Sequence, residues 1–176
     1  KKVHSASQKY KFVQMDITKS FKSIKNEYSN IVCNFGIHYL YKSDPQFQEL
    51  MSHIMTNLEI GGHFICTIVD SEYIKKVPFS MHSKGREIVS YYNYNQTDLS
   101  LYMNGNNYLT FNNNESVIDI NMFLGVCLRL GLEVVESDSF EDIYNKQDKF
   151  QLETYEKDMS FMYRRLVFKK ISCMQL

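Results

Sequence analysis

"NIVCNFGIHYLY", residues 30–41, begins as an apolar run and ends in asparagine, histidine and aromatic side chains. Its first half, 30–35, is typical of a strand buried in a sheet. In open α/β sheets, ligands bind just beyond the carboxyl ends of the strands. Side chains placed where this strand runs out are therefore candidates for holding a substrate. The stretch predicts both a sheet and the edge of that sheet at which a site lies.

A helix and a second strand follow and indicate the fold class. Segment 43–62 repeats apolar residues at helical spacing, with Asp44 as a candidate cap, Pro45 suited to the first turn and the pair Gly61-Gly62 predicted as its stop. The continuous apolar run 63–70, "HFICTIVD", is typical of a strand covered on both faces in a parallel sheet. Strand, helix and strand in this order predict a right-handed crossover, and hence an α/β fold.

The segments before and after this unit predict further β-structure. Segment 9–16, "KYKFVQMD", alternates weakly and stops at an acid, which predicts a strand that delivers Asp16 to a loop. Residues 77–114 are polar and aromatic, and Asn104-Gly105 lies between two β-prone runs. We expect this part to form a hairpin that leaves the sheet, with its tyrosines used for packing.

The last third of the chain predicts one more helix and two strands. Segment 119–130 is amphipathic at helical spacing and is followed by Gly131 as a stop. Segments 132–140 and 161–170 read as the last two strands. The polar stretch between them, 141–158, is expected to be a mobile loop.

Composition favours one domain without a strong net electrostatic field. The 176 residues are 44% hydrophobic and carry 20 basic and 20 acidic side chains, so any contact with nucleic acid must be local. No apolar run is long enough to cross a bilayer, and the four cysteines lack metal-ligand spacing. We expect a soluble, intracellular protein with reduced cysteines, no metal site and one domain, 1–176. It would comprise a sheet and helix core at 9–76, a hairpin excursion at 77–114, and a helix with the last strands at 115–176.

Three elements carry a resemblance to a known family. They are the stretch 35–39 after the first strand, the pair Gly61-Gly62, and the strand and polar turn at 64–70. In this order they resemble the messenger-RNA cap guanine-N7 methyltransferases, and the similarity spans most of 9–170. The resemblance implies a Rossmann-like sheet flanked by helices, in the strand order 3-2-1-4-5-7-6, and S-adenosylmethionine as the methyl donor.

The resemblance also implies which residues hold the donor. Asp16 matches an acid that sits near the adenine, and Ile17 beside it would touch the ring. Asn34 and Phe35, together with Tyr39, match positions that line the methionine and sulfonium end. Without the resemblance, Asp16 could simply cap a turn.

For the substrate, the resemblance implies that Phe35, His38 and Tyr39 contact the guanine of the cap and that Arg165 lies near it. A methyl group activated as a sulfonium needs no strong acid or base when the acceptor is a ring nitrogen. The protein's task is then alignment of donor and acceptor, so we assign no catalytic acid, base or nucleophile. Aromatic walls suit this task because they stack on a purine. The alternative is that His38 has a structural role and forms hydrogen bonds within the protein.

Two departures from the family bear on base recognition. Met122 stands where the family has a glutamate that hydrogen-bonds the guanine, so Glu115 or Asp119 would have to substitute, or cap binding would be weaker. Arg165 stands at or beside the position of an aromatic near the cap, unless Tyr163 serves instead. Its helical spacing also predicts that Met122 is a core residue.

The sequence contains no G-x-G motif of the kind that cradles the donor in Rossmann-like folds. We therefore expect these residues to be the C-terminal part of a larger methyltransferase domain. The resulting interpretation is a cap guanine-N7 methyltransferase that acts on the GpppN end of RNA, in the nucleus if cellular and in the cytoplasm if viral. Its expected partners are other capping-enzyme domains or an activating subunit, and no association with a membrane is expected. Two alternatives stay open, a catalytically inactive methyltransferase-like subunit of a capping complex and a methyltransferase for another acceptor.

Overall fold

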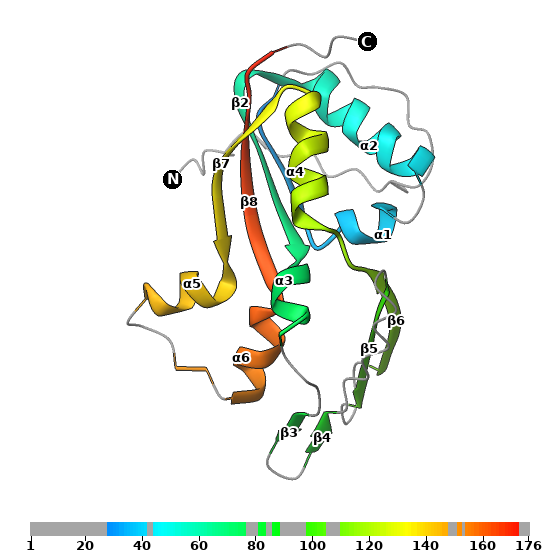
Figure 1. Cartoon of the computed structure of the whole chain (residues 1–176), viewed down its shortest axis with the longest axis vertical. Helices are drawn as coiled ribbons and strands as arrows, with labels where there is room; N and C mark the ends of the chain where they lie inside the picture. Colours follow the sequence, from blue (N-terminus) through cyan, green and yellow to red (C-terminus); the bar gives the residue numbers. More distant parts are fainter. Residues whose placement is uncertain are drawn as a thin grey trace, which may run out of the picture.

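The computed structural model describes residues 28–41, 44–76, 81–83, 86–88, 98–104, 110–147, 151–152 and 154–172. Its centre is a four-stranded sheet in the order β1-β2-β8-β7 (Figure 1). The strands are β1 (Tyr28–Asn34), β2 (Leu58–Val69), β7 (Leu132–Ser139) and β8 (Tyr163–Lys170). β1 and β2 are parallel, and β8 runs antiparallel to both β2 and β7. This is the order expected of strands four, five, seven and six, so the predicted fold class is confirmed.

Two helices cover one face of this sheet, α2 (Asp44–Asn57) and α4 (Ile120–Arg129) (Figure 1). The apolar side chains of β2 and β8 that face them are fully buried, and those of β1 are partly buried, as alternation along a strand predicts. The helices add apolar side chains at helical spacing to the same cluster. The core consists mainly of Phe47, Met51, Ile54, Met55, Phe64, Cys66, Ile68, Phe123, Cys127, Leu166 and Phe168. Burial raises the pKa of the Cys127 thiol to about 12, so it stays protonated at neutral pH.

The predicted helix 43–62 was too long at its end. α2 stops at Asn57, whose Nδ2 donates to the carbonyl of His53 over 2.8 Å. Lys170 of β8 is buried and donates from Nζ to the carbonyl oxygens of Met55 and Leu58, at 2.6 and 2.7 Å. A cation that binds the last carbonyls of a helix stabilises its end. Because Lys170 is distant in sequence, the local pattern does not reveal this stop.

The opposite face of the sheet is only partly covered, which corrects the expectation of burial on both faces. Val32, Ile65 and Val167 form one register row across three strands. Val32 is 56% exposed, and the other two are half-buried. Burial on both faces of β2 begins only near its carboxyl end, at Thr67 and Val69.

Short helices and two hairpins gather beyond the carboxyl ends of β1, β2 and β7 (Figure 1). The helices are α1 (Ile37–Tyr41), α3 (Ser71–Ile74), α5 (Phe140–Asn145) and α6 (Thr154–Phe161). The hairpins pair β3 (Met81–Ser83) with β4 (Arg86–Ile88), and β5 (Asp98–Asn104) with β6 (Thr110–Ser116). The second hairpin was predicted, although its turn lies outside the described residues. The first hairpin was not predicted.

The predicted mobile loop 141–158 was wrong where the structure describes it, because α5 and α6 occupy most of it. Ser139 caps α5: its Oγ accepts from the backbone N–H of Asp142 over 3.0 Å and donates to the carboxylate over 2.7 Å. A serine followed three residues later by an acid satisfies free N–H groups at a helix start. This local signal was present in the sequence and was missed.

Some predictions fall outside the described residues, among them the strand 9–16, with Asp16, and the tyrosine-rich stretch 91–94. The helix predicted at 119–130 is confirmed as α4, with Asp119 as its N-cap and Gly131 at a φ of 87° directly after it. Among the described residues, no helix is both long and apolar enough to cross a membrane.

Candidate active site at the carboxyl ends of the strands

We call the surface formed by Asn34, Phe35, Asp70, Ser139 and Tyr163 the carboxyl rim. Asn34, the last residue of β1, and Asp70, which follows β2, lie at the carboxyl ends of parallel strands. Ser139 ends β7, and Tyr163 begins the antiparallel β8 at the same end of the sheet. The topology therefore brings together residues that are up to 129 positions apart, since they run from 34 to 163.

Phe35 leaves the sheet through an unusual backbone conformation. Its φ of 53° is the only positive value among the described residues that are not glycine. A bulky residue in this region is strained by roughly 1–3 kcal/mol, and such strain clusters at functional sites. The turn is followed at once by α1, which carries His38 and Tyr39.

The ring of Phe35 forms an aromatic cluster on the carboxyl rim. It meets the ring of Tyr163 edge to face, with centroids 4.9 Å apart, and the ring of Phe140 at 6.4 Å. Phe140 and Tyr163 are themselves 6.1 Å apart. Phe35 remains 44% exposed, so the cluster is not a sealed core. It offers an aromatic wall to a flat ligand.

His38 does not lie as expected. We predicted an imidazole open to a purine, whereas its exposed fraction is 1%. The reason is that residues 37–41 form α1, which packs against α2 and β6 and turns His38 inward. Burial lowers the pKa of His38 to about 4, so the ring is neutral at pH 7. Its centroid lies 4.3 Å from that of Tyr39, which is 49% exposed.

Asn34 has a defined partner on the neighbouring strand. Thr67 Oγ1 donates to Asn34 Oδ1 over 3.2 Å, and the two residues are register partners of β1 and β2. Thr67 is buried, whereas Asn34 is exposed. The Asn34 amide is therefore hydrogen-bonded to a buried hydroxyl while the residue itself remains exposed to solvent.

A buried ion pair fixes the other side of the carboxyl rim. Asp70 is 1% exposed; its Oδ1 accepts from the N–H groups of Glu72 and Tyr73 at the start of α3. Its Oδ2 accepts from Nε and Nη2 of Arg164, each at 2.9 Å. The Asp70 N–H also donates to the carbonyl of Met162 over 2.7 Å. One carboxylate thus joins β2, α3 and β8 next to Tyr163.

Arg165 is engaged in a charged cluster rather than open to a phosphate. Its Nη2 lies 2.8 Å from Glu136 Oε2 and 2.8 Å from Asp138 Oδ2. Lys146 adds a second cation, with its Nζ 3.1 Å from Asp138 Oδ1. Hydrogen bonds from Lys146 and Arg165 lower the pKa of Asp138. A ligand phosphate would have to compete with two carboxylates for the Arg165 guanidinium. Arg164 is likewise paired, with Asp70.

The positions expected to read the guanine edge are only partly described. Met122, predicted as core, is 55% exposed on α4, because Ile120, Phe123 and Cys127 occupy the inward face. Asp119 uses its Oδ1 to accept from the Met122 N–H over 2.9 Å, so this acid is committed to capping α4. The side chain of Glu115 lies outside the described part of the chain, as do Asp16 and Ile17.

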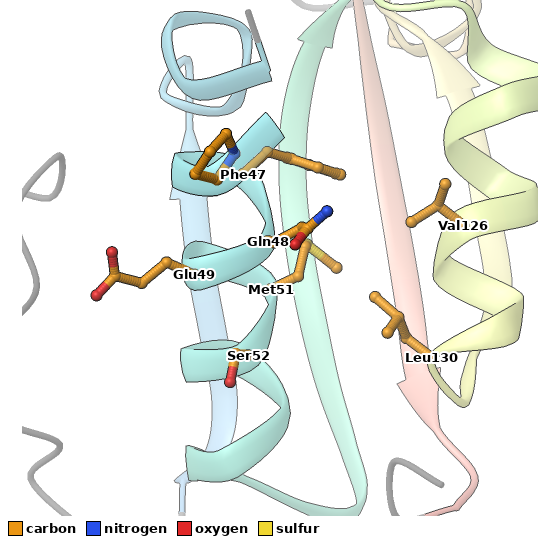
Figure 2. Close-up of a pocket in the computed structure, with 8 residues that line it drawn as sticks. Phe47, Gln48, Glu49, Met51, Ser52, Val126 and Leu130 are labelled. Atoms are coloured by element: carbon orange, nitrogen blue, oxygen red, sulfur yellow. The ribbon is translucent and has the colours of Figure 1, made fainter. Parts of the chain in front are cut away.

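Two of the cavities that described residues line differ in position, since one lies at the carboxyl rim and one on the helix-covered face of the sheet. One, of about 410 Å³, adjoins the carboxyl rim and is lined by residues that include Asp70, Ser139 and Arg164. The other, of about 560 Å³, lies between α2 and α4 (Figure 2). There Met51 faces Val126 and Leu130 across the groove. Its mostly apolar walls lie on the helix-covered face, whereas the strand ends gather at the rim, so we place the candidate site at the rim.

Sequence reasoning missed Phe140 and Thr67 and the pairing of Asp70 with Arg164. Phe140 and Thr67 lie within strand-like segments and carried no signal of their own. Asp70 was included as the end of a strand, but its partner Arg164 is 94 residues away. Only the three-dimensional register joins these residues to Phe35, while Tyr163 was named as a substitute for an aromatic near the cap.

Comparisons with known proteins agree with this fold. The model of the mRNA (guanine-N(7))-methyltransferase domain matches residues 6–171. A S-adenosylmethionine-dependent methyltransferase from Clostridium acetobutylicum ATCC 824 has a similar structure, with a TM-score of 0.57 and 14% identity over 89% of this chain. The glycopeptide N-methyltransferase MtfA complexed with S-adenosylmethionine gives a TM-score of 0.53 and 14% identity over 89% of this chain. In both comparisons the chain spans 63% of the other protein's length.

Proposed function

Because the chain belongs to the mRNA (guanine-N(7))-methyltransferase domain family, we propose that it transfers a methyl group from S-adenosylmethionine to N7 of the guanine cap of messenger RNA. The observation that carries the proposal is the family match over most of the chain together with the half-exposed Phe35 of the carboxyl rim. An RNA end of GpppN type is the proposed substrate.

The proposed chemistry needs alignment rather than proton transfer. The lone pair of guanine N7 attacks the methyl carbon as the carbon–sulfur bond breaks. The sulfur keeps the bonding electrons and becomes neutral, and the positive charge passes to the methylated guanine. Holding donor and acceptor in line contributes up to about 7–11 kcal/mol in favourable systems. No side chain has to gain or lose a proton in this step.

We assign the residues by their exposure and position. Phe35 and Tyr39 supply exposed aromatic faces for the purine and for the sulfonium charge, to which π systems are attracted. Asn34 contacts the donor beside them, and Asp16 with Ile17 keeps the proposed role at the adenine. His38 is reassigned from direct contact to support of Tyr39, because its ring is buried against that neighbour.

The proposed roles in the last strand also change. The role of the family's aromatic residue near the cap is assigned to Tyr163 and not to Arg165, since the ring of Tyr163 already meets that of Phe35. Arg165 supports this strand through Glu136 and Asp138. Other capping domains or an activating subunit remain proposed partners.

The direct test is methyl transfer by the full natural polypeptide. Labelled S-adenosylmethionine is supplied with GpppA-ended RNA, and ApppA-ended RNA of the same sequence serves as the control. The proposal predicts label only in the guanine cap, recovered as 7-methylguanosine after digestion. Label at another atom, or equal labelling of the two RNAs, would reject guanine-N7 transfer.

A second candidate is a catalytically inactive subunit of a capping complex. It is favoured by exposed Met122 in place of the family's glutamate and by the commitment of Asp119 to the α4 cap. This candidate predicts no calorimetric heat of donor binding and no transfer to either RNA. Donor binding with transfer would eliminate it, and donor binding without transfer to a cap would favour another acceptor.

A further inference from the structure

The Asn34 amide is supported by a residue of the neighbouring strand to which no role has been given. Thr67 Oγ1 donates to Asn34 Oδ1 over 3.2 Å from the register-matched position on β2. Thr67 is 4% exposed, and Asn34 lies at the surface. The buried hydroxyl therefore contacts the amide from the interior side, and the rest of the amide faces solvent.

The burial of Thr67 decides which end of the amide faces outward. A buried hydroxyl proton needs an acceptor, and Asn34 Oδ1 supplies one. If the amide were turned over, Nδ2 would face Oγ1, and the hydroxyl proton would lose this acceptor. The amide is thus held with Oδ1 toward Thr67, which leaves the two Nδ2 protons of this exposed side chain to donate to a ligand.

The next residue in the same row does not compete for this amide. Arg165 is the register partner of Thr67 on β8. Its Nη2 turns away from β1 and is bound by Glu136 and Asp138, both at 2.8 Å. The threonine and asparagine therefore form a neutral pair that is separate from the charged cluster.

We propose that Thr67 is a positioning residue that fixes Asn34 as a hydrogen-bond donor, and that this donor recognises the carboxylate of the amino-acid part of the methyl donor. The inference rests on the proposed function, because it needs S-adenosylmethionine at the carboxyl rim. Two outward N–H groups suit an acceptor oxygen, and a charged acceptor strengthens the hydrogen bond. The same orientation disfavours contact with the ammonium group of the amino acid.

The test uses calorimetry on the full natural polypeptide with two probes. S-adenosylhomocysteine has the amino-acid part, and 5′-methylthioadenosine lacks it. In Thr67→Val, which keeps the branched shape, the affinity for S-adenosylhomocysteine should fall about three- to tenfold, while that for methylthioadenosine stays unchanged. Thr67→Ser should restore the native value. Thr56→Val, an exposed position on α2, is the matched control.

Asn34→Asp gives a second test that does not depend on the packing of Thr67. It replaces the outward N–H groups with a carboxylate oxygen, so S-adenosylhomocysteine should bind at least about tenfold more weakly. Tighter binding in Asn34→Asp would show an ammonium contact and overturn the inference. Equal weakening of both probes in Thr67→Val, or no weakening, would also overturn it. A native polypeptide that binds neither probe would reject the proposed function itself.

Discussion

Two aromatic pairs on the same sheet differ in burial. Phe64 and Phe168 are cross-strand partners beneath the helices, with stacked rings 6.0 Å apart and no exposed surface. Phe35 and Tyr163 meet at 4.9 Å on the carboxyl rim, and Phe35 is 44% exposed. The first pair lies among apolar neighbours that fill the core, whereas the second lies beside a buried ion pair and a strained turn. The same strands thus supply a closely packed core beneath the helices and a partly exposed aromatic cluster at the carboxyl rim.

The largest change in stability is expected beneath the helices. Phe168→Ala should lower the free energy of unfolding by about 3–5 kcal/mol, because it removes a fully buried ring and leaves a cavity. Urea unfolding followed by circular dichroism measures this change. Phe168→Leu keeps most of the volume and should cost much less. A loss below about 1 kcal/mol for the alanine variant would mean that the ring is not part of a close-packed core.

A comparable but smaller loss is expected at the carboxyl rim from Asp70→Ala. The substitution removes the α3 cap and leaves Arg164 without its carboxylate, so we expect a loss of about 3 kcal/mol in the free energy of unfolding. The double variant Asp70→Ala with Arg164→Met should recover part of this loss, because no unpaired buried charge remains. Additive losses in the same urea measurement would argue against coupling of the two residues.

The buried imidazole predicts a pH dependence. The pKa of His38 falls from 6.5 to about 4 on folding, so the unfolded chain binds more protons between these values. The contribution of the neutral His38 ring to the free energy of unfolding should therefore be fully present above pH 6.5. It should decrease as pH falls toward 4, by at most about 3 kcal/mol. Urea midpoints from pH 7 to pH 4 measure the slope. His38→Gln should flatten it, and an unchanged slope in this variant would show that another group titrates.

The smallest effect on stability is expected from Phe35→Gly. Glycine adopts a φ of 53° without strain, which offsets the loss of ring contacts that are half in water. We expect the free energy of unfolding to change by less than about 1 kcal/mol. A thermal unfolding curve measures the change, and a loss like that of Phe168→Ala would place Phe35 in the core instead.

The sequence predicted the elements that local periodicity defines. The first strand, the start of α2, the whole of α4 and the last two strands follow from apolar spacing and glycine stops, and each is confirmed. The strand order came from the family resemblance. The end of α2 was mispredicted because Lys170, far along the chain, binds its carbonyls.

At the carboxyl rim, the sequence predicted the exposure of some side chains and not of others. Phe35 and Tyr39 are exposed as expected, but the burial of His38 depends on how α1 packs against α2 and β6. The engagement of Arg165 depends on the register of β7 and β8. Contacts between distant segments determine which polar side chains are open to a ligand, and local patterns do not encode them.

The central claim is that Phe35 faces the guanine, and its most direct test compares two aromatic residues of one short segment. Phe35→Leu lies at the carboxyl end of β1, and Tyr28→Leu replaces a residue of similar exposure, 45%, at its amino end. The measured quantity is kcat/KM for GpppA-ended RNA with the full natural polypeptide. We predict a fall of about tenfold or more for Phe35→Leu, from lost stacking, and a value near native for Tyr28→Leu. Equal values for the two variants would contradict the account.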